Sequence, residues 1–536
     1  MSFLNKIFQS IPVKIPDRSG FDLSHEVLST AQCGTVTPVT HFEVLPGDTI
    51  SMGSLMKVTL PPFAVPFMGR IDAELTAAFI PYRLLWKGWE RFITQNDGVS
   101  PSVSSGSPQI PFSVPLVDLH SVPARGTLAD YLGYNYASRG SALPFLAYHK
   151  FCDDWIRDDN IMKPFFAKNP IIPSATQSMS DLLDDLVLQM PHFVPHYQAF
   201  EDEEVISLPL AATGAPTDQS FAEKNVYDYS IGLGDLRQRC WSKDYFTTAT
   251  TRPQAGAEAS VTFDTSGATG SFTIASLRAA NALQKWAERN NIAGTEYGDQ
   301  ILAHFGVRPP DAVLNRSILL GQIRTPVYVG SVTNNNADAN SAKAGTSSPY
   351  GNILGSAAGF GSGSDKGSLV DNFTAKEHGI IMVFFTLIPH AYYDSGILRQ
   401  NRHTLVGDFA WPEFAGIGDQ AIEVGELYGG SNNPTSIFGY NQRYSEYKFL
   451  PDRVSGKLAT GEDLSVYALK RSFSSNPSLG SQFLEIPTNY LLQVFASWDP
   501  DAGTGDEFPV DWSCMMDLYF DAKALRVLPE YSLPHL

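Results

Sequence analysis

The sequence has few cysteines, little charge and no long hydrophobic run. Its cysteines form no CxxC pair, so neither a zinc site nor a disulfide framework is indicated. The longest apolar run, Ile380 to Phe385, is far shorter than the roughly 20 residues of a membrane helix. Because the first twenty residues contain no stretch typical of a signal peptide, we expect a cytoplasmic protein. We expect buried free thiols at Cys33, Cys152, Cys240 and Cys514.

Catalytic signatures are missing as well. The sequence has no GxxxxGK[ST], GxSxG or HExxH motif, which leaves no basis for P-loop, hydrolase or zincin chemistry. Residues 416–421 match the dinucleotide fingerprint in form, but no predicted strand precedes them, and we interpret them as a glycine loop. His192 and His196 are spaced like metal ligands, yet Pro191 and Pro195 prevent the helix that would align them. We therefore expect no enzyme, metal or cofactor.

Two adjacent pairs of acids, residues 153–154 and 158–159, are the remaining candidates for acid–base catalysis. They flank Arg157, and helix capping and ion pairing explain them as well as catalysis does. We expect substitutions of single acids or histidines to act through folding or assembly alone.

The balance of charged and aromatic residues points to covered surfaces. Charged residues are 18% of the chain, below the roughly 25% of ordinary soluble domains, while aromatic residues reach 12%. Interfaces between proteins are enriched in aromatic residues and depleted in lysine and glutamate, so partner subunits are expected to cover much of this chain. The net charge of −18 is concentrated, because nine acids and no Lys or Arg lie between Asn169 and Glu223. That run indicates either a solvated face or an insertion that points outward.

Strand patterns occupy both ends of the chain. Apolar and polar residues alternate from Ile50 to Leu60 and from Ile71 to Ile80, as in half-buried strands. Residues 379–389 form a continuous β-branched and aromatic run, which predicts a strand covered on both faces. Residues 490–498 and 514–520 add two strands near the C-terminus. The pattern predicts one β-domain closed by distant segments.

Few helices are predicted. Residues 180–190 carry an apolar stripe that Ser180 caps and Pro191 ends, and residues 276–290 show helical spacing of apolar side chains. Residues 331–368 are rich in Gly, Ser and Asn and have too few large apolar residues to form a core. We expect an arm or loop there.

Several blocks of the sequence resemble one known family. They are similar to blocks in the major capsid proteins of microviruses, especially gokushoviruses, and they occur in the same order along the chain as in that family. The blocks include PGDTISMGSLMKV (46–58), DAELTAAFIPYRLLWKGWERFI (72–93), CDDWIRDDN (152–160), KDYFTTATTRPQAG (243–256), FAWPEFAGIGDQAI (409–422) and FGYNQRYSEYKFLPDRVSGKL (438–458). The resemblance covers nearly the whole chain. It implies a mainly β structural protein, an eight-stranded viral jelly roll with long loop insertions that contain a few helices.

The resemblance also implies an assembly. Sixty copies would close a T=1 icosahedral shell around a circular single-stranded DNA genome, in a virion assembled in the host cytoplasm. Further partners would be scaffolding proteins, minor pilot proteins and a host surface receptor. Because phosphate binding depends on Lys and Arg and the subunit is acidic, we also expect a small basic DNA-binding protein or polyamines inside the particle.

Three insertions are expected within a single domain spanning residues 1–536. Residues 160–242 form the acidic insertion, a candidate surface protrusion whose host-facing residues are Glu201, Asp202, Glu203 and Glu204. The family typically carries a large insertion before the helix near Leu277, but here residues 257–276 are short and predict a hairpin. Residues 331–368 are the third insertion.

Candidate contact residues form two groups. The basic clusters are interpreted either as scattered DNA contacts or as surface ion pairs, and they comprise Arg399, Arg402, His403, Lys470 and Arg471. An aromatic ridge either docks as a helix on the chain's own barrel or anchors a neighbouring subunit, and it comprises Tyr82, Trp86, Trp89 and Phe92.

Two other classes of protein share this composition. A secreted carbohydrate-binding or glycan-cleaving β-sandwich is also acidic, aromatic and glycine-rich, but it should carry a signal peptide. A bacterial scaffold or filament protein is the third interpretation. Closed particles in the electron microscope would separate the capsid from both.

Overall fold

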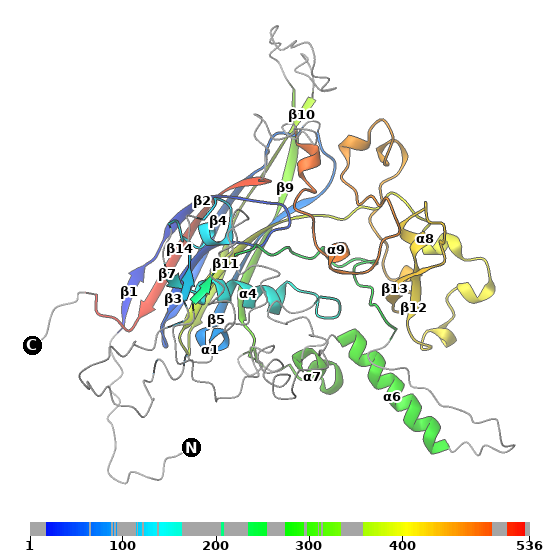
Figure 1. The fold of residues 1–536 in the computed structure, drawn as a ribbon, viewed down its shortest axis with the longest axis horizontal. Coiled ribbons are helices and arrows are strands. Elements are labelled where there is room, and N and C mark those ends of the chain that lie inside the picture. Colours follow the sequence, from blue (N-terminus) through cyan, green and yellow to red (C-terminus); the bar gives the residue numbers. More distant parts are fainter. Residues whose placement is uncertain are drawn as a thin grey trace, which may run out of the picture.

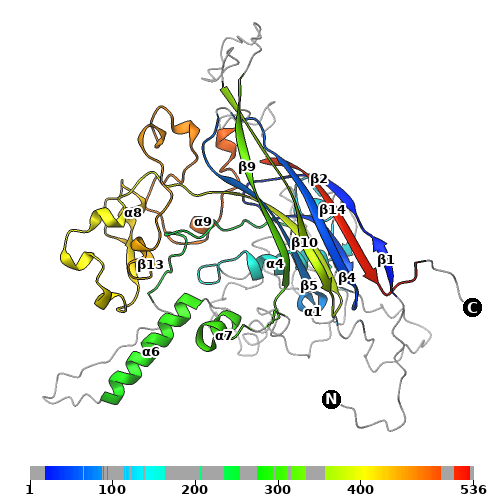
Figure 2. The same cartoon turned by 180° about the vertical axis from the view of Figure 1, so that it is seen from behind.

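The computed structural model describes residues 18–63, 66–86, 116–119, 123–136, 139–162, 205–207, 234–253, 274–293, 297–308, 315–333, 357–495 and 512–530, and the single positions 89, 93, 114, 310 and 311. Figure 1 shows a large curled sheet on one side and a lobe of short elements on the other. Figure 2 shows the same arrangement from behind.

A nine-stranded antiparallel sheet is the main element of the described part. Its order is β1-β14-β4-β10-β9-β5-β11-β3, and β2 also pairs with β14, so strands from both ends of the chain lie together. The predicted mainly β fold is therefore confirmed, while the eight-stranded jelly roll stays a prediction. The strands are β1 (Ser19–Asp22), β2 (His25–Ala31), β3 (Thr37–Val44), β4 (Thr49–Thr59), β5 (Ile71–Pro81), β9 (Ile318–Thr333), β10 (Ala357–Thr374), β11 (Gly379–Pro389) and β14 (Cys514–Arg526).

Strand β4 shows how alternation builds the core. Ile50, Met52, Met56 and Val58 are buried, whereas the outward side chains from Leu55 onward are more accessible. Strand β14 alternates in the same way along its length. The strands predicted at 50–60 and 514–520 are therefore confirmed.

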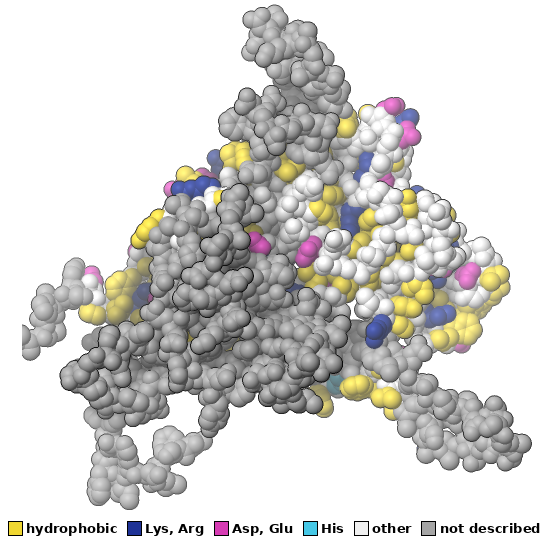
Figure 3. Space-filling model, in the orientation of Figure 1, with side chains coloured by type: hydrophobic (Ala, Val, Ile, Leu, Met, Phe, Trp, Pro, Cys, Tyr) yellow, Lys and Arg dark blue, Asp and Glu magenta, His cyan; other side chains and the backbone are white. Residues whose placement is uncertain are grey.

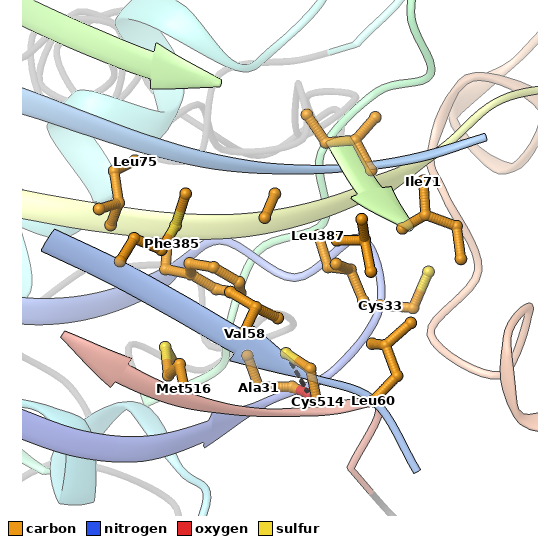
Figure 4. Packing of buried hydrophobic residues seen from close by; sticks show 14 of the residues in the cluster. Ala31, Cys33, Val58, Leu60, Ile71, Leu75, Phe385, Leu387, Cys514 and Met516 are labelled. Carbon is orange, nitrogen blue, oxygen red and sulfur yellow. Dashed lines mark hydrogen bonds between the residues drawn. The ribbon is translucent and has the colours of Figure 1, made fainter. Parts of the chain in front are cut away.

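The core inside the curl is shown in Figure 4. Val58, Leu75 and Phe385 come from β4, β5 and β11 and belong to one cluster of buried side chains. The cysteines are free, as predicted, with three buried and Cys240 partly buried. Burial raises the pKa of Cys240 to about 11 and that of Cys514 to about 12, so these thiols stay protonated and unreactive at neutral pH.

Strands β5 and β11 are buried along their whole length. Their outer face packs against helix α4 (Leu143–Trp155), where the ring of Phe151 stacks on that of Phe384 with centroids 3.8 Å apart. The strand predicted at 379–389, covered on both faces, is confirmed. The strand predicted at 71–80 is confirmed, but the prediction that it is half-buried is wrong. Helix α4 and polar partners cover the face that was expected to contact solvent.

Asp72 is an acid on the covered face of β5. Its carboxylate accepts hydrogen bonds from Arg70 (3.1 Å), Arg324 (2.9 Å) and His390 (3.2 Å). Burial tends to raise the pKa of Asp72, but the hydrogen bonds from His390 and Arg70 and the charge of Arg324 hold it below its ordinary value. These contacts tie β5 to β9 and to the segment after β11.

The glycine-rich segment 331–368 differs from its prediction. Residues 357–368 lie in β10 and 331–333 end β9, so both flanks of the expected loop belong to the sheet. Glycine allows β10 to pack closely against β9. A Cβ atom on Gly367 would stand only 2.9 Å from the side chain of Ile323, so a larger residue would clash there. Neighbouring strands thus supply apolar surface to the glycine-rich half of β10, while Leu369 and Val370 in its other half are buried in the core. Residues 334–356 lie outside the described residues.

The lobe has a small core of its own. Aromatic rings join its distant segments, with centroids 4.9 Å apart for Phe246 and Tyr393 and 4.8 Å apart for Phe438 and Phe483. Short elements surround this core: β12 (Gln420–Glu423), β13 (Ile437–Asn441), α8 (Val424–Leu427), α9 (Ser481–Leu484) and several 3-10 turns. The strand predicted at 490–498 is wrong in its described part, where residues 492–494 form a 3-10 turn.

The remaining described elements are short apart from α6. The helix predicted at 276–290 is confirmed as α6 (Ile274–Ala293), which α7 (Tyr297–Phe305) follows. The others are α1 (Tyr82–Leu85), α3 (Leu128–Tyr131) and a small sheet of β6 (Leu116–Asp118), β7 (Arg139–Ser141) and β8 (Val205–Ser207). None of the described helices is both long and apolar enough to cross a membrane. The helix predicted at 180–190 lies outside the described residues, as does the 257–276 hairpin except where α6 begins.

Candidate subunit-contact and nucleic-acid surfaces

One loop of the lobe exposes a concentration of large apolar side chains. We define the apolar loop as residues 404–418, which contain two acids and no Lys or Arg. Each of its large apolar side chains is more than two-fifths exposed, and Val406 reaches 73%. They are Leu405, Val406, Phe409, Trp411, Phe414 and Ile417.

Local hydrogen bonds fix the shape of the apolar loop. The Asp408 carboxylate accepts from the backbone N–H groups of Thr404 and Leu405, both at 2.8 Å. Those hydrogen bonds hold the pKa of Asp408 below its ordinary value. The indole N–H of Trp411 donates to the carbonyl oxygen of Val406 at 2.9 Å. The loop therefore presents its apolar side chains in a preformed arrangement, which lowers the entropic cost of binding a partner.

The space-filling view in Figure 3 shows hydrophobic side chains gathered over the lobe, with Lys and Arg among them. Scattered apolar residues are normal on a protein surface, but a contiguous group marks a site of interaction. The lobe therefore carries a surface suited to contact other molecules.

The first predicted DNA-contact cluster is engaged within the lobe. Each of its members faces a carboxylate: Arg399 with Glu426 at 3.0 Å, Arg402 with Glu423, and His403 with Glu446 at 3.6 Å. Burial raises the pKa of Glu426, although a backbone hydrogen bond and the charge of Arg399 oppose the shift. This geometry favours the ion-pair interpretation over DNA contact, because the cations are already neutralised.

The second predicted cluster also serves the lobe. The Lys470 ammonium donates to the carbonyl oxygens of Leu458 (2.8 Å) and Ser465 (3.1 Å). Arg471 is buried, donates to the carbonyl oxygen of Phe483 at 2.6 Å and lies 4.0 Å from the centroid of that ring. Arg471 braces the small core and Lys470 ties together neighbouring turns of the lobe, so both are poorly placed to reach a nucleic acid.

The aromatic ridge does not form one helix. Helix α1 ends at Leu85, and Trp86 is extended. Tyr82 and Trp86 are buried on the chain's own sheet, and the Trp89 ring meets that of Tyr82 edge to face with centroids 4.7 Å apart. This placement favours docking on the chain itself over anchoring a neighbour. Phe92 lies outside the described residues.

The acid pairs around Arg157 have structural partners. Arg157 pairs with Asp159 at 2.8 Å, and the Asp154 carboxylate accepts from Lys150 at 2.7 Å and from the backbone N–H of Ser317 at 2.8 Å. The ion-pair interpretation is thus confirmed, although Asp154 pairs with Lys150 and not with Arg157. The capping interpretation stays a prediction. After residues 416–418, strand β12 follows instead of a helix, which confirms the glycine-loop interpretation. His192, His196 and Glu201–Glu204 lie outside the described residues.

The apolar loop was missed by sequence reasoning. Its residues were noticed only within a family block (409–422) and a glycine loop (416–421), because they follow neither the period of a strand nor that of a helix. The available signal was six large aromatic or branched side chains beside two acids and no Lys or Arg.

A curled antiparallel sheet and a lobe with an exposed apolar surface define a β-rich structural protein that associates with other chains. The chain belongs to the phage capsid protein (F protein) family, whose model matches residues 9–536. This confirms the resemblance to microvirus capsid proteins and identifies a structural component of the virion, not an enzyme. It also excludes the secreted β-sandwich and bacterial scaffold interpretations.

Three relatives match along almost their whole length. Capsid protein VP1 of Chlamydia phage 1 is 27% identical over 100% of this chain and 98% of the relative. Capsid protein VP1 of Bdellovibrio phage phiMH2K is 27% identical, over 98% and 97%. Capsid protein VP1 of Spiroplasma virus 4 is 24% identical, over 97% and 95%.

Proposed function

We propose that sixty copies of this chain close a T=1 icosahedral shell around a circular single-stranded DNA genome. The family match over residues 9–536 carries this proposal, because it covers the whole subunit and not an isolated module. A closed shell needs self-complementary surfaces on every copy. Assembly takes place in the host cytoplasm with scaffolding and minor pilot proteins, and the finished virion binds a host surface receptor.

The apolar loop is the surface that we assign to contact between copies. Interfaces between proteins have an apolar centre depleted in charged residues and enriched in aromatic ones, and Phe409, Trp411 and Phe414 provide such a centre. The absence of Lys and Arg from the loop makes it unsuited to DNA. A second copy of the chain is therefore its partner.

The charge of the shell requires additional cations. Sixty copies at −18 each carry a formal charge of −1080, and the packaged DNA is also anionic. Lys and Arg must displace counterions for a protein to bind phosphate, so a small basic protein or polyamines should accompany the genome. Mass spectrometry of intact particles tests this, and particles that contain neither would contradict it.

Residues 169–225 of the acidic insertion are proposed to point away from the genome and to meet the host. Like charges at this density are hard to bury and repel phosphate, and Glu201–Glu204 are the densest part. Replacement of residues 201–222 by a short Gly/Ser linker should still permit assembly but lower adsorption to cells. A variant that fails to assemble, or that infects normally, would contradict the assignment.

Electron microscopy and native mass spectrometry of the purified chain test the proposal as a whole. Uniform closed particles with a mass of sixty subunits are expected, and nuclease-protected DNA should be found inside those made in infected cells. Monomers, open filaments or particles of another copy number would overturn it.

A further inference from the structure

A second exposed surface follows strand β13 and differs in character from the apolar loop. We define the basic-aromatic strip as Arg443, Tyr447, Lys448, Phe449 and Arg453. Phe449 is 59% exposed and Tyr447 51%, so neither ring is part of a core. Lys448 and Arg453 are exposed as well, and Arg443 is partly exposed. Cations thus alternate with accessible rings along eleven residues, from 443 to 453.

The cations of the strip have no carboxylate partner among the residues that the structure describes. The Arg443 guanidinium lies over the ring of Tyr444, 5.4 Å from its centroid. The Lys448 ammonium donates to the side-chain oxygen of Gln442 at 3.3 Å. Since Arg399 and Arg402 nearby are both paired with carboxylates, the strip differs from the first cluster singled out in the sequence. It differs from the second cluster because Lys470 and Arg471 donate to backbone carbonyl oxygens of the lobe.

The acid within this segment is turned away from the strip. Glu446 is buried, lies 3.6 Å from His403 and accepts a hydrogen bond from the side chain of Gln420. Asp452 is the one exposed acid between residues 443 and 453. The surface of the strip is therefore positive, although the chain as a whole carries −18.

The backbone holds the strip in a fixed shape. Tyr444 adopts a left-handed conformation (φ 61°), and the N–H groups of Lys448 and Phe449 both donate to the Ser445 carbonyl oxygen at 2.9 Å. The Tyr447 ring stacks on that of His403 with centroids 6.0 Å apart. One face of the Tyr447 ring is thus packed against His403, while about half of the side chain stays accessible. A planar group such as a base could stack on the accessible face.

We propose that the basic-aromatic strip binds single-stranded DNA. Accessible rings stack on unpaired bases of any sequence, and unpaired cations beside them bind the phosphates. A protein partner is less well matched, because lysine is depleted at the centres of protein interfaces and the Lys448 ammonium has no carboxylate partner among the described residues. This inference rests on the proposed function, since it names the part of the subunit that meets the packaged genome.

The first test measures binding of a labelled oligothymidine to the full chain at several salt concentrations. The triple variant R443Q/K448Q/R453Q should lower the slope of log K against log salt by about 2, at about 0.7 per lost phosphate contact. The double variant Y447A/F449A should bind about thirtyfold more weakly or worse, with the slope unchanged, at about 1 kcal/mol or more per lost ring. Unchanged affinity and slope in both variants would overturn the proposal.

Two matched controls locate the effect. Lys457 is an exposed cation of the same lobe that pairs with Glu462 at 2.7 Å, and K457Q should bind like the unmodified chain. W411S removes an exposed ring from the apolar loop and should also leave DNA binding unchanged. An equal loss in either control would show that charge or exposed rings in general are responsible, and it would overturn the assignment to the strip.

The second test needs no variant, so it stands even where a substitution prevents folding. Purified particles are irradiated and digested with trypsin, and peptides bearing a nucleotide are identified. Peptides 444–448 and 449–453 should carry cross-linked nucleotides, whereas cross-links confined to other segments would overturn the proposal. A chain that binds oligothymidine through the strip but forms no particles would refute the shell and leave the strip standing.

Discussion

The sheet and the lobe use their large apolar side chains in opposite ways. In β5 and β11 every residue is buried, and even Asp72 is enclosed by cationic partners. In the lobe, the apolar loop keeps six large apolar side chains at the surface. Strands β5 and β11 are therefore stabilised within one chain, whereas the apolar loop becomes fully buried only when another molecule covers it.

The two regions also differ in what holds them together. The sheet combines long backbone ladders with a core shared by β4, β5, β11 and β14. The lobe consists of short turns around a small aromatic core, braced by Arg471 and by the pair of Arg399 and Glu426. Substitutions should consequently affect folding in the sheet and association in the lobe.

The sharpest form of this comparison uses the same substitution in both regions. Phe385→Ala should lower the free energy of unfolding by about 3–5 kcal/mol, because Phe385 is buried in the sheet core and the cavity left behind cannot close fully. Phe414→Ala in the apolar loop should change it by about 0.5 kcal/mol or less. Urea denaturation of the purified chain measures both, and similar losses in the two variants would refute the distinction.

The enclosed carboxylate of Asp72 gives a prediction about pH. Its pKa in the folded chain lies below the unfolded value of about 3.9, so its stabilising contribution is present above that pH and is lost as the pH falls through the folded pKa. Asp72→Asn should destabilise the chain by about 1–3 kcal/mol at neutral pH, because charged hydrogen bonds are lost. The difference between the two proteins should shrink below pH 4. A constant difference from pH 7 to pH 3 in urea denaturation would contradict this.

In the lobe, the effect should move from folding to assembly. Trp411→Ser combined with Phe414→Ser should change the unfolding free energy by about 0.5 kcal/mol at most, yet reduce the yield of closed particles about tenfold or more. Tyr136→Ser, which removes an exposed ring outside the apolar loop, is the matched control and should assemble normally. Particle yield by sedimentation decides between the two. Normal assembly of the double variant would remove the loop from the interface.

The smallest effect is expected at an exposed ion pair. Lys457 pairs with Glu462 at the surface of the lobe, where solvent screens the attraction. Lys457→Gln should shift the unfolding free energy by about 0.5 kcal/mol or less and leave particle yield unchanged. A larger loss would show that surface ion pairs stabilise the lobe more than its geometry indicates.

Several elements could be predicted from the sequence because their patterns are local. The alternation at 50–60, the continuous apolar run at 379–389 and the helical spacing at 276–290 each correspond to an observed element. Local sequence patterns failed to predict structure and burial where contacts with distant segments determine them. The glycine-rich half of strand β10 relies on side chains of neighbouring strands for its apolar contacts, and β5 is covered by α4, which its own alternation cannot reveal.

The contact surfaces were harder to predict than the fold. A basic residue looks the same in sequence whether it is paired or not. The sequence therefore left DNA contacts and ion pairs open for Arg399 and Arg471, and the fold gives each a partner. Arg443 and Lys448 lie in the block 438–458, which was noticed only for its resemblance to the family. That they have no carboxylate partner among the described residues could be learned only from the structure. The resemblance identified the family, and the structure identifies the candidate surfaces.

Oxidative footprinting of tryptophan and phenylalanine side chains, in the unassembled chain and in closed particles, tests the central claim most directly. Phe409, Trp411 and Phe414 should be oxidised readily in the unassembled chain and protected in particles, because a neighbouring copy covers them. Phe384 and Phe385 in β11 should be protected in both states. Equal oxidation of the apolar loop before and after assembly would contradict the claim that the lobe keeps its apolar surface for other copies.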